Sequence, residues 1–464
     1  MQYQACGGQL RCAKGKIAEE QNFPRVLCLD IRINSRVSVT ALVGGELICF
    51  SGSGELLQFI CIRMLYTYGK YATAFLNRVL VFMSLLFLCR QCILFLNYFW
   101  GYIFMEKSFN VAVIGATGMV GQRFITLLNN HPWFHVKMLA ASQRSANKTY
   151  KEAVGSRWAM SEDIPENIKD MVVLDAVADK EKIAKEVDFV FCAVDMKKDE
   201  IRALEEAYAK LECPVISNNS AHRHTDDVPM IIPEINPGHA EIIDSQRKRL
   251  GTKRGFIAVK SNCSLQSYVP ALHPLLKYGI KEVVACTYQA ISGAGKTFKT
   301  FPEILDNVIP YIGGEEEKSE VEPMKIWGKI EGGKIVDASS PSITAQCLRV
   351  PVSDGHTAAV FVRFENKPSI EQIKADWSAF SGEPQKLGLP SAPKQFLHYF
   401  EENDRPQAKL DRNLENGMAV SVGRLREDKV YDIKFVCLSH NTLRGAAGGA
   451  VLMAELLAAK GYLD

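Results

Sequence analysis

Apolar and polar residues alternate along the later part of the chain in the manner of linked strand and helix units. A short apolar run of strand type spans 109–114, and three glycines follow it directly at Gly115, Gly118 and Gly121. Residues 122–130 then show helical periodicity. Strand, glycine turn and helix in this order are typical of a nucleotide-binding βαβ unit. The spacing G-x-x-G-x-x-G fits a plain structural turn about equally well.

The same alternation continues through the next hundred residues. Apolar runs predict further strands at 135–140, 188–194, 214–218 and 255–260. Helical periodicity predicts a helix at 197–210, and the charged stretch 241–254 predicts a solvated linker before the last strand. The pattern as a whole predicts an α/β, doubly wound domain that binds a dinucleotide.

The loop after the second strand indicates which dinucleotide binds. An NAD-specific site carries an acidic residue at the end of this strand to hold the ribose 2′-hydroxyl. No Asp or Glu occurs between residues 107 and 151, where the strand runs instead into Ser142, Arg144 and Ser145. Hydroxyl and guanidinium groups suit a 2′-phosphate, so we expect NADP, unless Arg144 is simply a solvated loop charge.

A candidate nucleophile follows the last predicted strand. Cys263 lies in the segment SNCS, directly before an apolar stretch, 265–276, that predicts a helix. A thiol at a helix N-terminus is expected to have a lowered pKa, because the helix dipole stabilises the thiolate. From this segment alone, a buried structural cysteine is equally consistent.

A second segment provides partners for such a nucleophile. If 349–352 forms a strand, Arg349 lies near a turn that presents His356. A planar clamp for a carboxylate and a proton-transfer group would then share one cleft. An imidazole with an ordinary pKa near ~6.5 suits proton transfer at neutral pH. Taken alone, His356 is more often a hydrogen-bonded loop histidine.

Composition separates the first hundred residues from the rest. Of 55 Lys and Arg and 52 Asp and Glu, residues 1–104 hold 10 and 5, so the remaining 360 residues hold 45 and 47 and lack the charge of a nucleic-acid-binding domain. Six of the 13 cysteines fall after residue 104, which is typical of reduced, mostly buried thiols. The pair Cys89 and Cys92 has metal-ligand spacing, but it lies in an apolar run without a second pair, so we expect no metal site.

The apolar run 79–104 leaves three interpretations of the first 104 residues open. They form a membrane anchor, a poorly structured extension, or translated sequence upstream of a start at Met105. We favour the third, which gives a cytoplasmic enzyme; the first gives a membrane-anchored one. On any of them, these residues lie outside the enzyme fold.

From about residue 108 to 458 the sequence resembles the aspartate-semialdehyde dehydrogenase family, most closely the branch typical of archaea and fungi. The resemblance is carried by GATGMVGQRF at 115–124, ASQRSANKTY at 141–150, SNNSAHR at 217–223, SNCS at 261–264, YQAISGAG at 288–295, IPYIGGEEEK at 309–318, RVPVSDGHT at 349–357, APKQ at 392–395, DRPQ at 404–407 and SHNTLRGAAGG at 439–449. It implies a Rossmann-type NADP-binding domain, 105–262 with 441–464, and an α+β catalytic and dimerisation domain, 263–440.

The resemblance also implies roles for individual residues. Cys263 is the acyl-thioester nucleophile, His356 the general acid and base, and Gln289 orients the substrate. Arg349 clamps the substrate carboxylate, Glu315 faces the substrate, and Lys318 and Arg223 bind phosphate, with Glu315 uncertain by one or two positions within its acidic run. The residues implied in cofactor binding are Gly115, Thr117, Gly118, Met119, Val120, Ser142, Arg144, Ser145, Ser292, Gly293 and Asn441.

The expected reaction is NADPH-dependent reductive dephosphorylation of β-aspartyl phosphate to aspartate semialdehyde, in the biosynthesis of lysine, threonine and methionine. The expected partners are this small-molecule substrate, phosphate, and further copies of the chain in a homodimer or homotetramer, with no nucleic acid. Two alternatives remain: an acyl-CoA reductase of the same fold, such as malonyl-CoA reductase, and a membrane-tethered binding protein without activity. The intact set Cys263, Gln289, Arg349 and His356 argues against the second.

Overall fold

The computed structural model describes residues 29–34, 36–43, 46–52 and 107–464. The chain divides into two units, Met1–Met105 and Glu106–Asp464. In the first, β1 (Leu29–Asn34), β2 (Arg36–Val43) and β3 (Glu46–Gly52) form an antiparallel sheet in that order. The apolar run 79–104, with Cys89 and Cys92, lies outside the described residues. Over the described ranges, no helix combines the length and apolar character needed to cross a membrane.

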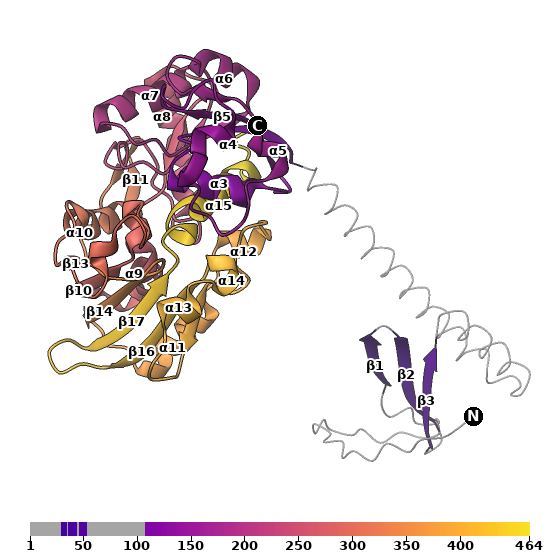
Figure 1. Ribbon diagram of the computed structural model, residues 1–464. Helices are drawn as coiled ribbons and strands as arrows, with labels where there is room; N and C mark the ends of the chain where they lie inside the picture. Colours follow the sequence, from indigo (N-terminus) through magenta and orange to yellow (C-terminus); the bar gives the residue numbers. More distant parts are fainter. Residues whose placement is uncertain (1–28, 35, 44–45, 53–106) are drawn as a thin grey trace, which may run out of the picture. The chain divides into compact units, whose positions relative to one another are not determined.

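A six-stranded parallel sheet organises the first half of the second unit (Figure 1). Its strands are β4 (Phe109–Ile114), β5 (Phe134–Ala141), β6 (Val173–Asp175), β7 (Phe189–Cys192), β8 (Val215–Ser217) and β9 (Ile257–Val259). They are arranged in the order β6-β5-β4-β7-β8-β9. The order reverses at β4, which is the arrangement of the doubly wound dinucleotide-binding fold. The predicted Rossmann-type domain is confirmed.

Helices cover this sheet. They are α3 (Met119–Leu128), α4 (Tyr150–Val154), α5 (Glu166–Lys169), α6 (Lys180–Glu186), α7 (Lys198–Lys210) and α8 (Ile243–Leu250), with short 3₁₀ turns at Gly155–Arg157 and Pro237–Ile242. The C-terminal helix α15 (Gly448–Ala459) is mostly apolar and is buried in the same core as β4 and α3, where Figure 1 draws it in yellow among the violet elements. The end of the chain therefore completes the nucleotide-binding fold.

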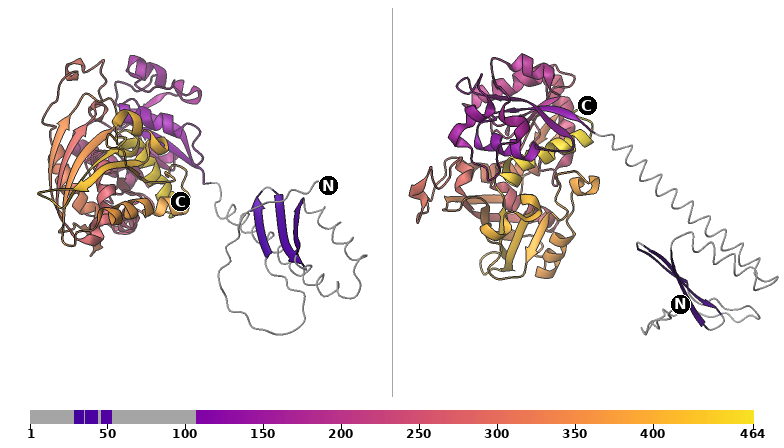
Figure 2. Two further views of the ribbon diagram at one scale, coloured as in Figure 1. Left: turned by 90° about the horizontal axis from the view of Figure 1, so that it is seen from below. Right: turned by 45° about the vertical axis from the view of Figure 1, so that its right-hand side comes forward.

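A mixed six-stranded sheet forms the other half of this unit, and Figure 2 shows it from two further sides. The strands are β10 (Ile280–Gln289), β13 (Ser342–Arg349), β14 (His356–Phe364), β15 (Leu397–Phe400), β16 (Val420–Glu427) and β17 (Ile433–Ser439). They run in the order β13-β10-β14-β17-β16-β15. A small hairpin, β11 (Lys329–Glu331) and β12 (Lys334–Val336), stands apart from the sheet. The expected α+β domain is confirmed.

The helices of this half are α9 (Leu265–Leu272), α10 (Glu315–Ile326), α11 (Ile370–Ala379), α12 (Glu383–Leu387), α13 (Ala408–Asp411) and α14 (Leu414–Gly417). Short 3₁₀ segments occur at His273–Tyr278, Ile291–Ala294 and Pro302–Ile304, and a π-helical turn at Leu443–Ala447. Helix α9 is buried along its whole length and packs on β14, β16 and β17. We propose the domain division 105–262 with 441–464, and 263–440, because the two sheets fall on either side of it.

Three local predictions are wrong, each for a physical reason. The charged stretch 241–254 is no linker, since it contains α8, whose buried Gln246 satisfies the N–H and the carbonyl of Ile257. The helix predicted at 265–276 ends at Leu272, because Pro274 cannot donate the next helical hydrogen bond. The strand predicted at 349–352 ends where it was expected to begin, at Arg349, since Pro351 cannot extend the ladder.

Candidate active site

The three glycines of the loop after β4 differ in how closely the surrounding backbone packs against them. Gly115 has a φ of +88°, and a Cβ there would lie 2.3 Å from Ala193 O; a Cβ at Gly121 would lie 2.2 Å from Gly115 O. A Cβ at Gly118 would meet nothing closer than 3.5 Å. The first and third glycines therefore allow strand, loop and helix to pack closely. Only Gly118 faces open space, from which a ligand can approach.

Helix α3 begins at Met119 directly after this loop. The N–H groups of Met119 and Val120 lie in the first turn, where an α-helix provides no internal acceptor. Such N–H groups, together with the helix dipole, bind phosphate. Thr117 precedes them and is almost buried, with its carbonyl accepting from Gln122 Nε2 at 3.1 Å. This geometry fits the pyrophosphate of a dinucleotide.

The loop after β5 lies one strand away. Ser142 and Arg144 are exposed, whereas Ser145 is buried. The main chain is a turn, closed by the Ser145 N–H donating to Ser142 O at 2.8 Å, and Lys148 Nζ donates to Arg144 O. The Arg144 guanidinium has no protein partner among the described residues. It is free to pair with an anion.

The register of the mixed sheet brings three predicted site residues to one edge. Strands β10 and β13 are parallel, and Gln289 pairs with Arg349 at the end of both. Strand β14 runs antiparallel to β10 and begins at His356, so its first residue lies at the same edge. Gln289, Arg349 and His356 are all buried there.

Cys263 and His356 are in contact at this edge, with 3.4 Å between Cys263 Sγ and His356 Nε2. The other ring nitrogen, His356 Nδ1, accepts the main-chain N–H of Ala290 at 3.0 Å. In a neutral imidazole one nitrogen accepts and the other carries the proton. The Ala290 N–H therefore selects the tautomer in which Nε2–H points at the sulfur.

The pKa values of this pair differ from the expected ones. Burial lowers the pKa of His356 well below 6.5, and the positive charge of Arg349 lowers it further. Burial raises the pKa of the Cys263 thiol, and the Glu315 carboxylate adds to this, against the opposing effect of nearby cations. The expected ordinary histidine pKa and lowered thiol pKa are therefore wrong for this state, because removal from water favours the neutral form of both groups.

Arg349 has capacity left for a ligand. Its Nη1 donates to Ala290 O at 2.7 Å, which uses one of the five guanidinium donors. A Cβ at Gly293 would lie 3.0 Å from the His356 ring and 3.1 Å from Arg349 Nη1. Gly293 therefore allows both side chains to lie against the 3₁₀ turn Ile291–Ala294.

Glu315 is the centre of a second cluster. Its carboxylate accepts from Asn262 Nδ2 at 3.0 Å, from Lys318 Nζ at 2.7 Å and from Gln289 Nε2 at 3.3 Å. Burial raises its pKa, but Lys318 and these hydrogen bonds outweigh burial, so the net shift is downward. The neighbouring Glu316 turns away and accepts from Gln346 and Cys347 of β13.

Arg223 lies beneath this cluster in a buried ion pair. Its Nη1 donates to Glu322 Oε1 at 2.9 Å, its Nε to Lys260 O at 2.9 Å, and its Nη2 to Asn218 O at 3.3 Å. Two of its five donors remain. An anion here would share Arg223 with Glu322.

Asn441 links the 3₁₀ turn Ile291–Ala294 to the turn before His356. Its Nδ2 donates to Ser292 Oγ at 2.9 Å, and its Oδ1 accepts from the Gly355 N–H at 2.8 Å. Asn441, Ser292 and Gly293 thus lie together beside the Cys263 and His356 pair.

Sequence reasoning missed Asn262, Glu322 and Lys260. Asn262 anchors the loop that carries Cys263 to helix α10 through two hydrogen bonds. Its side-chain Nδ2 donates to Glu315, and its main-chain N–H donates to Glu322 Oε2 at 2.6 Å. Helical periodicity would have found Glu322, which is seven residues after Glu315 and hence on the same face of α10. Lys260 gave no such signal, because it reads as the polar end of a strand.

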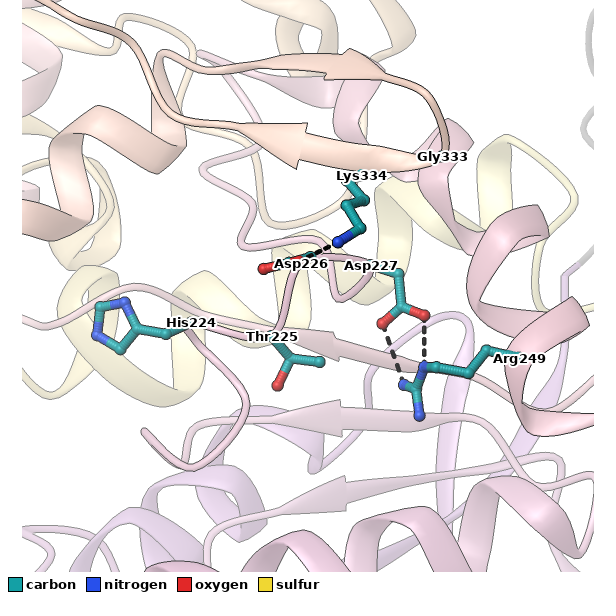
Figure 3. Close-up of a pocket in the computed structure, with 7 residues that line it drawn as sticks. All are labelled: His224, Thr225, Asp226, Asp227, Arg249, Gly333 and Lys334. Carbon is teal, nitrogen blue, oxygen red and sulfur yellow. Dashed lines mark hydrogen bonds and ion pairs between the residues drawn. The ribbon is translucent and has the colours of Figure 1, made fainter.

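A shallow pocket of about 430 Å³ lies elsewhere, and Figure 3 shows its lining. Its charged groups pair with one another: Asp226 with Lys334 at 3.0 Å, and Asp227 with Arg249 through two contacts. None of the predicted site residues lines it. Within 107–464 and the three described N-terminal strands, no group of three or more His, Cys, Asp or Glu is arranged to hold a metal ion.

Comparison with known proteins agrees with this geometry. The family described as semialdehyde dehydrogenase, NAD binding domain, matches residues 110–243, and its dimerisation domain matches 272–444. The aspartate-semialdehyde dehydrogenase of Saccharomyces cerevisiae is 44% identical over 76% of this chain and 98% of its own length, and that of Methanothermobacter thermautotrophicus is 44% identical over 75% and 98%.

Solved structures give the same result. The crystal structure of aspartate-semialdehyde dehydrogenase with NADP from Candida albicans superposes with a TM-score of 0.69, at 41% identity over 76% of this chain and 99% of that one. The resemblance inferred from the motifs is confirmed. The chain therefore belongs to the aspartate-semialdehyde dehydrogenase family.

Proposed function

We propose that this chain reduces β-aspartyl phosphate to aspartate semialdehyde with NADPH and releases phosphate. The observation that carries the proposal is the Cys263 Sγ to His356 Nε2 contact of 3.4 Å, at an edge that also holds Gln289 and Arg349. A nucleophile, a proton donor and a carboxylate clamp in one buried cleft are the set that acyl transfer to an enzyme thiol requires. The product supplies lysine, threonine and methionine synthesis.

Cys263 performs the covalent step. Its sulfur bonds to the acyl carbon while the carbon–oxygen bond to phosphate breaks, so phosphate leaves with the electron pair. The nearby cations Lys260, Arg223 and Arg349 favour the thiolate that attacks, against the opposing effect of burial. Splitting the reduction into thioester formation and reduction lowers each barrier.

His356 serves as the proton donor at Nε2. The Ala290 N–H keeps the Nε2–H tautomer facing the reacting atoms. This proton stabilises the negative oxygen that forms when the thioester carbon is reduced, and afterwards the released thiolate. A neutral donor suits a buried site, because it adds no charge that must be desolvated.

Substrate recognition falls to the surrounding charges. Arg349, with four free donors, forms a fork to the α-carboxylate. Glu315 accepts from the α-ammonium group, and Gln289 orients the acyl group from the adjacent strand end. Lys318 and the two free donors of Arg223 meet the phosphate.

The cofactor fits the residues at the edge of the parallel sheet. Met119 and Val120 would hold its pyrophosphate, the open face of Gly118 would give it room, and Ser142, Arg144 and Ser145 would hold the 2′-phosphate. Gly115 and Thr117 shape that loop, while Ser292, Gly293 and Asn441 lie on the nicotinamide side. NADPH, when bound, supplies the hydride.

Turnover by the purified full chain tests the proposal. We expect NADPH oxidation that depends on β-aspartyl phosphate, releases one phosphate per NADPH, and is lost by more than about 10³-fold in Cys263→Ser. Asp226→Asn, in the unrelated pocket of Figure 3, serves as the matched control and should keep full activity. Equal turnover of malonyl-CoA would contradict the substrate assignment.

We also propose that the chain assembles as a homodimer or homotetramer in the cytoplasm. The matched dimerisation domain, residues 272–444, supports the assembly. Light scattering of the purified chain would measure its mass. Cell fractionation, with the mass of the native N-terminus, would test the location, and recovery of the enzyme in membranes would contradict it.

A further inference from the structure

A buried lysine next to the nucleophile has no anionic partner. Lys260 follows β9 directly, and about 2% of its surface is exposed. Its Nζ donates to Ser261 O at 2.6 Å, and this is its single hydrogen bond among the described residues. No carboxylate oxygen of the described residues lies within 4.0 Å of Lys260 Nζ. The nearby Arg223 and Arg444 each pair with a carboxylate. A buried ammonium group without a counterion is costly.

Lys260 and Cys263 lie against the same short segment of the chain, Gly445 to Gly449. A Cβ at Gly449 would lie 3.4 Å from Lys260 Cε, and a Cβ at Gly445 would lie 3.0 Å from Cys263 Cβ. Gly445 belongs to the π-helical turn Leu443–Ala447, and Gly449 belongs to the first turn of α15, which follows that turn directly. Both side chains are therefore covered by this one segment, which approaches them closely because it carries glycines at these two positions.

The contacts of His356 exclude it as the cation of the pair. Its Nδ1 accepts the Ala290 N–H, and an imidazolium would have to carry a proton on that same nitrogen. Arg349, Lys260 and His440 are further cations or potential cations that oppose a charge on the ring. A thiolate at Cys263 therefore needs another counterion.

We propose that Lys260 is a positioning residue that provides this counterion, so that its ammonium group stabilises the Cys263 thiolate while His356 remains neutral. This inference rests on the proposed function, because it explains how the proposed nucleophile is ionised. The thiol proton leaves to solvent or to the Lys260 amine, and Nε2–H of His356 donates to the resulting thiolate.

The titration behaviour of the two groups agrees with this pairing. Burial lowers the pKa of Lys260 to about 7, an effect that Arg223 and Arg444 reinforce and that Cys263 and Glu322 oppose. For Cys263, burial and Glu315 raise the thiol pKa, while Lys260, Arg223 and Arg349 lower it. Each group alone favours its neutral form, and each charge stabilises the other.

Site-resolved alkylation tests the proposal without substrate or cofactor. The full-length enzyme is treated with iodoacetamide between pH 5.5 and 10, and modification of the peptide that contains Cys263 is measured by mass spectrometry. In Lys260→Met we expect the thiol pKa to rise by about one unit or more, so that alkylation at pH 7 slows about tenfold or more. Failure of the proposed reaction would not alter this outcome.

Lys325→Met is the matched control. Lys325 is also buried, but its Nζ donates to Arg223 O at 2.8 Å and Thr225 O at 2.7 Å rather than to the loop that holds Cys263. Its replacement removes a buried charge of the same kind and should leave the alkylation profile unchanged. A shift equal to that of Lys260→Met would show a general electrostatic effect and would overturn the assignment.

Two further variants keep the test decisive. Lys260→Ile also removes the charge, and its β-branched side chain suits a position at the end of a buried strand. It replaces Lys260→Met if the methionine variant does not fold. His356→Gln should raise the thiol pKa less than the Lys260 variants, because a neutral ring contributes no charge. A tenfold or greater slowing in His356→Gln, or an unchanged profile in a folded Lys260 variant, would overturn the proposal.

Discussion

The cofactor loops and the nucleophile cleft differ in how their chemistry is held in place. Around Gly118, the groups that we propose to bind the cofactor are main-chain N–H groups and exposed side chains such as Arg144, while Gly115 and Gly121 are packed against backbone. Around Cys263, most polar side chains are buried and several hydrogen-bond one another, as in the four hydrogen bonds that Glu315 accepts. The first region depends on backbone shape and the second on a charge network in a low dielectric, where each partner affects the others.

The largest expected effect comes from the packed glycines. Gly121→Ala places a Cβ 2.2 Å from Gly115 O, which only a shift of the β4–α3 unit can relieve. We expect a loss of several kcal/mol in unfolding free energy, measured by urea denaturation.

Gly118→Ala is the matched control, since its Cβ meets nothing within 3.4 Å. It should leave stability nearly unchanged and instead weaken NADPH binding, measured by fluorescence titration. Equal destabilisation by both changes would contradict the separation of packing from binding in this loop.

In the nucleophile cleft, Arg349→Lys should act on the substrate and spare the cofactor. Lysine keeps the charge but cannot form the fork, and it also loses the bond to Ala290 O. We expect the KM for β-aspartyl phosphate to rise about 10²-fold, with an NADPH KM within about twofold of wild type. A matched rise in both constants would show that the cleft, rather than the clamp, had changed.

How far the sequence predicts each region follows from the same difference. The glycine loop is local, so a strand, three glycines and a helix period were enough to place it. The cleft depends on sheet register: Gln289 and Arg349 are 60 residues apart in sequence and meet because β10 and β13 are parallel. The motifs identified the residues of the cleft. They did not predict that the Ala290 N–H sets the His356 tautomer, or that Lys260 is buried near Cys263.

Errors in the sequence prediction have the same origin. The segment 241–254 is charged enough to be predicted as a linker, yet it contains the helix α8. The side chain of Gln246 in this helix hydrogen-bonds both the N–H and the carbonyl of Ile257 in β9. A polar residue that satisfies buried main-chain groups is invisible to hydrophobic periodicity. The expected thiol pKa was wrong because burial, which the sequence does not show, outweighs the nearby cations at Cys263.

The charge network predicts a pH effect of intermediate size. Because Lys318 and hydrogen bonds lower the pKa of Glu315, its carboxylate stays ionised at neutral and mildly acidic pH, and its contacts are lost only as pH falls through that lowered value. In Lys318→Met, the Glu315 pKa rises, because burial raises it and the ammonium group that lowered it is gone. We expect the acid limb of the kcat/KM profile to move up by about one pH unit. An unmoved limb would assign it to another group.

The smallest effect is expected on the exposed side of the comparison. Arg144 is solvated and has no protein partner within the described residues, so its contribution to a 2′-phosphate is screened by water and salt. Arg144→Ala should raise the KM for NADPH about fivefold, leave that for NADH unchanged, and leave unfolding free energy within about 0.5 kcal/mol of wild type. The NADPH effect should shrink as salt is raised from 50 to 500 mM, whereas the effect of Arg349→Lys, in the buried cleft, should change little. An equal loss with both cofactors would mean that Arg144 shapes the loop, and this region would then resemble the network around Cys263.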